Sequence, residues 1–411
     1  MVTLGWMRRE RRTRAATVVM AAAACYLVGP FALAAQSAGP PGRDWPRSDL
    51  RSSGLAEGPW AALDSAIVAG RHGHVDRVLV LRGGRIVYDR AYARDYRTIA
   101  AGARAFIGCG PGACDGADIP ATYNYFDPAT HPFRAGTDLH SLQSVTKSVI
   151  ATVLAAAQQA GVVRATADTP FLSLLGDAAR WAGDPRLQRA TLADLLTMRS
   201  GIEWHEIDRP LDGTNTTVAL ERSDDWVRFT LSQPMDAAPG ERFVYNSGGS
   251  HLIGAIIAAQ TGRDPVQVAD ELLFRPLGIR AFHWKRAGEG LPDGEGGLYL
   301  GAEDVARIGY LMLHDGMWGT RRILPAGWAR TATSRVVERT PNGLGYGYQW
   351  WRLDRDGVEI FGGLGFGGQF LFVIPQYDVI VVSFAWNVFG QRVPSLQGPL
   401  IAAVLSSVPR E

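Results

Sequence analysis

Lysine is almost absent from this sequence. Lysine and arginine together number 42, and only Lys147 and Lys285 are lysines, so 40 are arginines. Cysteine is scarce as well, with 3 residues in 411, which excludes a disulfide scaffold. The hydrophobic fraction of 46% excludes a disordered or collagen-like chain. Strong charge of either sign is also lacking, because the formal net charge is +2, and we therefore expect no nucleic acid partner.

Residues 1–34 predict an export signal. A basic segment precedes an apolar one at 15–33, and Ala32-Leu33-Ala34 is a small-x-small cleavage site. The basic residues are Arg8, Arg9, Arg11, Arg12 and Arg14. A cleaved signal predicts a periplasmic or secreted protein with no membrane span in the mature chain. One alternative is an uncleaved membrane anchor, because the apolar run approaches the roughly 20 residues that a span needs. Another is a lipid on Cys25, although its flanking residues fit that role badly.

The rest of the chain predicts one domain, residues 58–411, after a linker at 35–57 that is rich in proline, glycine and serine. Strand patterns occur near both ends of this domain, and helical periodicity dominates between about 165 and 330. We therefore predict an α/β (α+β) fold. An antiparallel sheet from the N- and C-terminal segments is flanked by helices, and a mostly helical lobe is inserted between them.

The individual elements follow from local patterns. Val75–Leu81 and Arg85–Tyr92 flank Gly83-Gly84 and predict a β-hairpin, while residues 98–138 predict a loop. Further strands are expected at 345–352, 357–361, 369–374 and 379–386, and helices at 144–160, 192–198, 223–231, 251–260, 265–273, 302–314 and 396–407.

The segment around Ser144 carries the strongest chemical signal. Ser144 and Lys147 are three positions apart at the start of a predicted helix, so they lie on one face about one turn apart. A serine hydroxyl needs a base, and lysine can serve when burial and nearby positive charge lower its pKa, whereas arginine stays protonated. The backbone N–H of Ser144, at the helix start, is a predicted oxyanion donor. The alternative is a surface lysine, which this arginine-rich chain otherwise avoids.

These residues resemble the active-site motif of a known family. Ser-x-x-Lys within SLQSVTKS at 141–148 is similar to that of serine hydrolases related to class C β-lactamases, penicillin-binding proteins and esterases of that fold. The branch that contains 6-aminohexanoate-dimer hydrolase is the most similar. Further similar stretches, in the family's order, are LLTMRSGIEW at 195–204, FVYNSGGSHLIGAII at 243–257, LFRPLGI at 273–279 and GFGGQFLFVIPQYDVIVVSF at 365–384. The resemblance covers about residues 60–405 and implies a β-lactamase/transpeptidase-like fold.

Tyr245-Asn246-Ser247 stands where the family carries Tyr-x-Asn or Tyr-x-Ser. The resemblance implies that Tyr245 shuttles a proton beside Lys147, and we expect the neighbouring ammonium to lower the pKa of this phenol. The alternative is a tyrosine that only fills the core. Ser247 is predicted to be a polar contact, either of the substrate or of the residues around the catalytic groups, or alternatively to take part in a turn.

The family's third motif is missing. β-Lactamases and penicillin-binding proteins carry Lys-Thr-Gly or His-Thr-Gly where this sequence has Gly363-Leu364-Gly365. The basic residue helps to bind a substrate carboxylate, so its absence argues against β-lactams and peptide termini. We expect Gly365 to let the backbone approach a bound acyl group, and the N–H of Phe366 to be the second oxyanion donor. The alternative is a bulged strand and turn at 362–368 that does not contact the substrate.

Other polar residues carry weaker indications. His205 follows Trp204 on a predicted loop and either binds the substrate or is solvated. Cys109 and Cys114 are predicted to form a small disulfide loop in an oxidising compartment. The sequence has no cluster with metal-ligand spacing and no cofactor fingerprint in its required context, so we expect neither a metal nor a cofactor.

Together these features predict an exported serine hydrolase. It would cleave a small-molecule ester or amide through an acyl-serine intermediate, using Ser144, Lys147 and Tyr245. The alternative enzyme is a β-lactamase or D-Ala-D-Ala carboxypeptidase. The alternative of another class is a catalytically silent ligand-binding sensor on the same fold.

Overall fold

The computed structural model describes residues 40, 42, 44–102, 125, 127–389 and 393–409. The predicted export signal and the two predicted disulfide cysteines, Cys109 and Cys114, lie outside these residues. Within them, no helix is both long enough and apolar enough to span a membrane.

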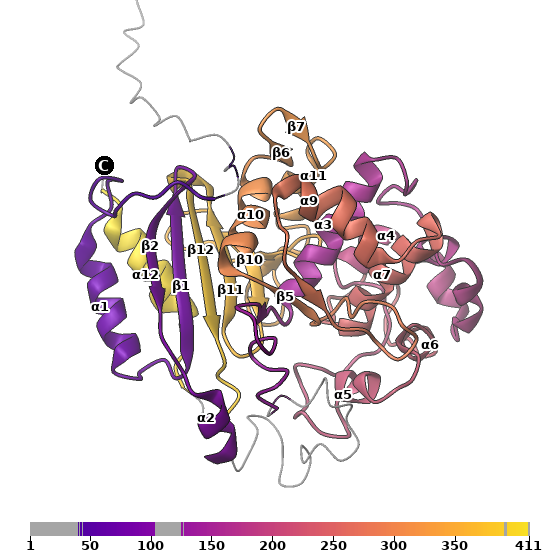
Figure 1. The fold of residues 1–411 in the computed structure, drawn as a ribbon. Coiled ribbons are helices and arrows are strands. Elements are labelled where there is room, and N and C mark those ends of the chain that lie inside the picture. Colours follow the sequence, from indigo (N-terminus) through magenta and orange to yellow (C-terminus); the bar gives the residue numbers. More distant parts are fainter. Residues whose placement is uncertain are drawn as a thin grey trace, which may run out of the picture. The chain divides into compact units, whose positions relative to one another are not determined.

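A seven-stranded antiparallel sheet combines the two ends of the chain, as predicted (Figure 1). Its strand order is β2-β1-β12-β11-β10-β9-β8. The strands are β1 (Val75–Arg82), β2 (Arg85–Ala91), β8 (Gly345–Tyr346), β9 (Trp351–Arg352), β10 (Phe361–Gly365), β11 (Gln369–Ile374) and β12 (Val379–Ala385). The N-terminal hairpin therefore pairs with the last strand, β12, in the centre of the sheet.

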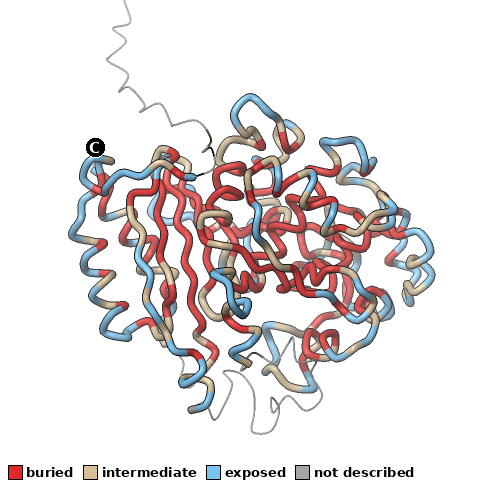
Figure 2. Tube along the Cα trace, viewed as in Figure 1, coloured by how far each residue is buried: buried red, intermediate tan, exposed pale blue. Residues whose placement is uncertain are grey.

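Both faces of this sheet are buried, because its strands alternate between two hydrophobic cores. In β12, Val379 and Val381 join the core beneath helices α1 (Glu57–Val68) and α12 (Gln397–Ser407), whereas Ile380 and Val382 face the opposite core. Helix α10 (Ala302–Leu313) covers that second face (Figure 1). Figure 2 shows the central strands as buried along most of their length.

The β1–β2 hairpin closes through the predicted two-glycine turn. Gly83 has a φ of 57° and Gly84 a φ of 68°. A two-residue turn with two positive φ values matches the right-handed twist of the strands, and glycine adopts it without steric cost. This explains why the hairpin could be predicted from the sequence.

The inserted segment is mostly helical, as predicted. Its helices are α3 (Val145–Gln159), α4 (Leu192–Leu196), α5 (Thr216–Glu221), α6 (Trp226–Leu231), α7 (Ser247–Thr261), α8 (Pro265–Ala269) and α9 (Arg275–Leu277). Three 3₁₀ segments occur at Phe171–Leu174, Gly176–Trp181 and Pro185–Arg189, and a π-helical turn, Asp270–Phe274, joins α8 to α9. The remaining elements are α2 (Tyr96–Gly102), α11 (Trp328–Ala332), β3 (His140–Ser141), β4 (His283–Trp284), β5 (Leu298–Leu300), β6 (Met317–Trp318) and β7 (Arg321–Arg322).

Several boundaries differ from prediction. The strand expected at 345–352 is two short strands, β8 and β9, and the strand expected at 357–361 begins only at Phe361. Residues 355–358 form a tight turn instead, in which Arg355 and Val358 exchange backbone hydrogen bonds. Within the predicted loop at 98–138, residues 98–102 belong to helix α2.

The described part of the predicted linker packs against the domain. Trp45 is 3% exposed, and its indole N–H donates to the carbonyl of Glu303 on α10 at 3.1 Å. Ser48 and Ile86 of β2 share a backbone hydrogen bond of 2.9 Å. Proline and glycine in this segment therefore do not prevent it from contributing to the core.

Candidate active site

Ser144 lies between strand β3 and helix α3, at the N-cap of the helix. The residue before it, Gln143, has a φ of 47°, a left-handed conformation that is uncommon outside glycine. This turn presents the Ser144 side chain at the helix start, where it remains partly exposed. The three-stranded sheet β3-β5-β4 holds the turn, since Leu142 donates its N–H to the carbonyl of Leu298 at 2.9 Å.

Lys147 is brought to Ser144 as the three-residue spacing predicts. Its Nζ donates to Ser144 Oγ at 2.9 Å, to the carbonyl oxygen of Glu295 at 2.8 Å and to Glu295 Oε2 at 3.1 Å. The residue is 1% exposed, so this is a buried ammonium with a full set of acceptors. The surface-lysine alternative is excluded by this burial.

The protonation of Lys147 differs from the prediction. Burial alone lowers the pKa of its ammonium, but the acidic groups of Tyr245, Glu295 and Glu206 favour the charged form and together raise the pKa above its ordinary value. The expectation of a lowered pKa considered only burial and positive charge. It was wrong because two carboxylates from distant parts of the chain surround this amine.

Tyr245 completes the cluster. Asn246 caps helix α7 by accepting the N–H of Gly249 at 2.7 Å, which fixes Tyr245 just ahead of the helix. The Tyr245 ring stacks on Trp351 at 5.7 Å, and Lys147 Nζ lies 5.3 Å from the ring centroid.

Burial raises the pKa of the Tyr245 phenol, although Lys147 acts in the opposite direction. The predicted lowering of this pKa is therefore also wrong, because the ring is 8% exposed and the cost of desolvating a phenolate dominates.

Two carboxylates that were not predicted to act here join the site through Ser247. Ser247 Oγ lies 2.8 Å from Glu206 Oε1 and 3.2 Å from Glu295 Oε2, and the residue is fully buried. Its hydroxyl is thus engaged between two acids, which fits a polar contact behind the catalytic groups, and its contact with the substrate remains a prediction. Glu206 follows His205 on the predicted loop without a motif that marks it, and nothing in the sequence around Glu295 marks that residue either.

Glycines on strand β10 let the sheet approach the Ser144 turn closely. A β-carbon on Gly365 would lie 2.5 Å from the Leu142 carbonyl oxygen, and one on Gly363 would lie 3.0 Å from Val145. Gly365 therefore allows a close approach to this protein's own backbone, while its approach to a bound acyl group remains a prediction. Strand β9 pairs with β10 only at Phe361 and Gly362, so the part of β10 beside α3 has no strand partner on that side among the described residues.

The backbone around Ser144 is compatible with the predicted oxyanion donor. The N–H groups of Val145, Thr146 and Lys147 bond to carbonyls within the first turn, whereas that of Ser144 has no acceptor among the described residues. Phe366 follows β10, with its ring 6.1 Å from that of Tyr125. Its role as the second donor remains a prediction.

His205 occupies an exposed loop. Its Nδ1 lies 2.7 Å from Asp208 Oδ2 and its Nε2 lies 3.3 Å from Glu203 Oε1. These two carboxylates raise the pKa of the imidazole. No described contact joins His205 to Ser144 or Lys147, so the predicted substrate contact remains a prediction.

The second lysine belongs to an adjoining buried cluster. Lys285 Nζ lies 3.0 Å from His131 Nε2, and burial lowers the pKa of Lys285 while Asp293, Glu221 and Glu295 oppose that shift. Both lysines of the chain therefore lie beside the segment 293–295. No three His, Cys, Asp or Glu side chains in the described part of the chain are grouped so that they could hold a metal ion.

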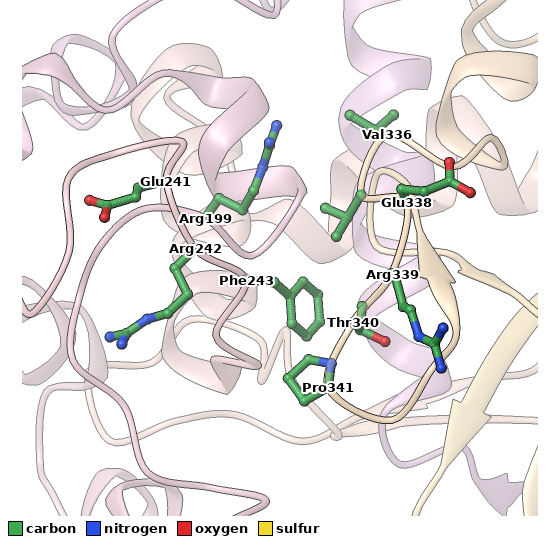
Figure 3. A pocket seen from close by; sticks show the side chains of 10 residues that line it. Arg199, Glu241, Arg242, Phe243, Val336, Glu338, Arg339, Thr340 and Pro341 are labelled. Carbon is green, nitrogen blue, oxygen red and sulfur yellow. The ribbon is translucent and has the colours of Figure 1, made fainter.

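A pocket of about 640 Å³ lies behind the aromatic residues next to Tyr245. Figure 3 shows its two walls, one from residues 199 and 241–243 and the other from residues 336–341. Phe243 lines the pocket, and its ring meets the Trp351 ring edge-on at a centroid distance of 6.2 Å. Tyr245 stacks on the same Trp351 ring. The pocket is therefore one layer of rings away from the phenol.

Comparisons with known proteins agree with the geometry. The family model described as Beta-lactamase matches residues 61–405. The 6-aminohexanoate-dimer hydrolase of Paenarthrobacter ureafaciens is 24% identical over 280 residues, which cover 62% of this chain and 68% of that protein.

Solved structures share the fold. A D-stereospecific amidohydrolase from Streptomyces sp. has a TM-score of 0.57 and 18% identity, and covers 87% of this chain and 98% of its own. EstCE1, a hydrolase with promiscuous acyltransferase activity, has a TM-score of 0.60 and 17% identity, and the match covers 87% of this chain and 100% of its own. At these identities the likeness establishes the fold alone.

Proposed function

The chain belongs to the beta-lactamase family, and on that premise we propose that it is an exported serine hydrolase that cleaves an ester or a small amide through an acyl-serine intermediate. The observation that carries the proposal is the 2.9 Å hydrogen bond between Lys147 Nζ and Ser144 Oγ, with the centroid of the Tyr245 ring 5.3 Å from the same Nζ. A nucleophile, a proton acceptor and a proton shuttle thus lie together at a partly exposed serine.

The proton path follows from the raised pKa values of Lys147 and Tyr245. At rest each group holds its proton, and the base forms when the pair loses one of them. Ser144 Oγ then bonds to the substrate carbonyl carbon while its proton passes to the pair. The leaving alcohol or amine takes that proton as the carbonyl–leaving-group bond breaks, and water repeats the sequence to release the acid. The rate should fall at acid pH, and the apparent pKa values of that fall belong to Lys147 and Tyr245 together.

The oxyanion that forms during attack needs hydrogen-bond donors. We assign this role to the backbone N–H groups of Ser144 and Phe366, which lie at the start of α3 and just after β10. The Ser144 N–H has no acceptor among the described residues, which supports the assignment of Ser144 as one of the two donors.

The substrate class is inferred from Gly363-Leu364-Gly365. This stretch of β10 offers neither a basic side chain nor a hydroxyl to bind a substrate carboxylate. We therefore favour an ester or small amide over a β-lactam or a D-Ala-D-Ala terminus. The names of the similar amidohydrolase and of 6-aminohexanoate-dimer hydrolase support acyl transfer from small amides.

Covalent labelling of Ser144 tests the proposal. Intact-protein mass spectrometry after a fluorophosphonate should find one adduct, absent from Ser144→Ala, and p-nitrophenyl acetate should give a burst of p-nitrophenol. A penicillin adduct or nitrocefin turnover would favour the β-lactamase alternative. A wild-type protein that neither labels nor hydrolyses esters and amides would favour the ligand-binding sensor.

The same spectra test export. Expression with residues 1–34 present should give a protein whose mass lacks them, recovered outside the cytoplasm. Retention of the full N-terminus in a membrane fraction would instead support an uncleaved anchor.

A further inference from the structure

The hydroxyl of Ser247 lies within hydrogen-bond distance of two acids but has a single proton. It can donate to only one of Glu206 Oε1, at 2.8 Å, and Glu295 Oε2, at 3.2 Å. The second contact is a hydrogen bond only if one of the two carboxyl groups is itself protonated. With both contacts hydrogen-bonded, one of the two carboxyl groups carries a proton, and we refer to Glu206, Ser247 and Glu295 as the row.

Glu206 is the member that holds this proton most readily. Its Oε2 accepts the backbone N–H of Ser247 and the indole N–H of Trp204, both at 3.0 Å, which leaves Oε1 for Ser247. Burial raises the pKa of Glu206, Lys147 opposes that shift and Glu295 adds to it. With the proton on Glu206, each bond in the row points the same way: Glu206 donates to Ser247, Ser247 to Glu295, and Lys147 to Glu295 from the other side.

Glu295 is fixed at the inner end of the row. Asp293 Oδ1 accepts the N–H groups of both Glu295 and Gly296 at 2.9 Å, which holds the turn that carries Glu295. Lys147 Nζ donates two hydrogen bonds to Glu295, one to its backbone carbonyl and one to its carboxylate. Lys147, Glu295 and Ser247 are buried and Glu206 is partly exposed, so Glu206 is the end of the row nearest to water.

We propose that Glu206, Ser247 and Glu295 are positioning residues that hold Lys147 as an ammonium and exchange its proton with water in the cleft. This inference rests on the proposed function, because it assigns how the base in that reaction is formed. None of the three touches the reacting atoms, since they act through Lys147.

The exchange balances as a series of proton transfers. Glu206 first releases its proton to water. A Lys147 N–H bond then breaks as an O–H bond forms on Glu295, Glu295 passes a proton to Ser247 Oγ, and Ser247 passes its own to Glu206. The net change is one proton moved from Lys147 to water, which leaves a neutral amine 2.9 Å from Ser144 Oγ. The reverse series restores the ammonium.

Other charged groups face this row. Tyr245 acts on Lys147 and Glu206. Asp293, Lys285 and Glu221 act on Glu295 from the adjoining cluster, and burial raises the pKa of Asp293 to about 6. These groups are unchanged in the substitutions below, so a change in the titration of Lys147 reports on Glu206, Ser247 and Glu295 themselves.

The scarcity of lysine makes a direct test simple. Protein grown with ¹³Cε-lysine contains two labelled side chains, and Lys147→Arg removes one signal and so assigns it. Wild-type Lys147 should remain an ammonium up to the highest pH at which the protein stays folded. In Glu295→Gln, and more so in Glu206→Gln with Glu295→Gln, its pKa should fall by about one to three units, because an opposite charge at this distance contributes that much.

Ser247→Ala separates the two parts of the proposal, the holding of the ammonium and the exchange of its proton. The variant keeps both carboxylates, so the titration of Lys147 should be nearly unchanged. It removes the hydroxyl that links them, so exchange of the Nζ protons with water should slow by at least about tenfold. Glu203→Gln is the matched control, because Glu203 lies on the same loop, 40% exposed and paired with His205. It should change neither quantity.

Two results would overturn the proposal: a Lys147 signal at the neutral-amine position in wild type at pH 7, or the same titration in Glu295→Gln and wild type. Unchanged proton exchange in Ser247→Ala would overturn the relay. These measurements need no turnover, so they are independent of labelling. Failure of the fluorophosphonate to label Ser144 would remove the proposed function while leaving a shifted Lys147 titration as support for the row.

Discussion

Gly365 and Leu142 are in such close contact that a β-carbon on the glycine would lie 2.5 Å from the leucine carbonyl oxygen. Leu142 is two residues before Ser144, so this contact sets the distance between β10 and the nucleophile. Gly365→Ala should therefore push the turn away, at a cost of about 1–3 kcal/mol in the free energy of unfolding. Because a displacement of about 1 Å at a reacting group can cost 100-fold in rate, p-nitrophenyl acetate hydrolysis should fall more than stability suggests.

Gly254→Ala is the control for that substitution. Gly254 is buried in helix α7, and the nearest atom to an added β-carbon is 3.8 Å away. Alanine should be tolerated there, with unchanged hydrolysis and equal or higher stability. Wild-type activity in Gly365→Ala would mean that the strand does not fix the position of Ser144.

Lys147→Arg should be as damaging as Lys147→Ala. Arginine keeps the positive charge but cannot give up its proton, and its larger head must fit where Lys147 is 1% exposed. We expect both variants to lose about 10²–10⁴-fold in the rate of the p-nitrophenol burst, the contribution typical of a general base. Thermal unfolding would identify any loss that comes from misfolding. Near-normal activity in a folded Lys147→Arg protein would show that the lysine supplies only charge.

Asp378 gives a pH-dependent prediction for stability. Burial raises the pKa of its carboxyl to about 6, although Arg82 opposes the shift. In the unfolded chain the value is about 3.9, so the carboxyl is protonated in both states below about pH 4. Between about pH 4 and 6 the unfolded chain loses its proton first, and the free energy of unfolding falls as pH rises through this window.

Asp378→Asn should therefore stabilise the protein at pH 8 and not at pH 4, as measured by thermal unfolding. The gain should be about 1 kcal/mol, because solvent screens this partly exposed group. Asparagine also tolerates the left-handed conformation of residue 378, which has a φ of 50°. Asp356→Asn is the matched control, with a φ of 52° and a side chain that is 82% exposed. Equal gains at both pH values would contradict the assignment to burial.

Much of the fold could be predicted because local signals agree with it. Gly83-Gly84 specifies the hairpin through its backbone preferences, and the apolar run of β12 is long enough to mark a strand buried on both faces. The region at 345–361 was predicted less well. Its strands are two residues long or displaced, and periodicity cannot identify elements that short.

The candidate site could likewise be predicted only in part. Ser144 and Lys147 could be paired from the sequence because one helical turn joins them, and Tyr245 because the family resemblance placed it. Glu206 and Glu295 could not, since they reach Lys147 from 59 and 148 residues away along the chain. A buried ammonium requires an acid, but the chain has 40 acidic residues, and only the fold selects these two. The predicted lowering of the Lys147 pKa was wrong for this reason, whereas the predicted lowering of the Tyr245 pKa was wrong because burial outweighs the effect of Lys147.

Gln349 joins the helices behind the site, and its removal should be costly. It is 1% exposed, its Nε2 donates to the Leu196 carbonyl at 3.0 Å, and its Oε1 accepts from Ser250 on α7 at 2.7 Å. Its backbone carbonyl accepts the hydroxyl of Ser148 on α3 at 2.6 Å. Gln349→Leu leaves the buried Ser250 hydroxyl without its acceptor, whereas the Leu196 carbonyl keeps the backbone N–H of residue 349, so denaturant unfolding should show a loss of about 1–3 kcal/mol.

Gln233→Leu provides the comparison for Gln349→Leu. Gln233 is only partly buried, and its side chain makes one hydrogen bond, to the Phe229 carbonyl at 2.9 Å. Its replacement should cost less than about 1 kcal/mol, as is usual for a site near the surface. If Gln349→Leu unfolds at the same denaturant concentration as Gln233→Leu, the hydrogen bonds of Gln349 do not hold α3 and α7 together, and the position of Ser144 must depend on the contact between β10 and Leu142 instead.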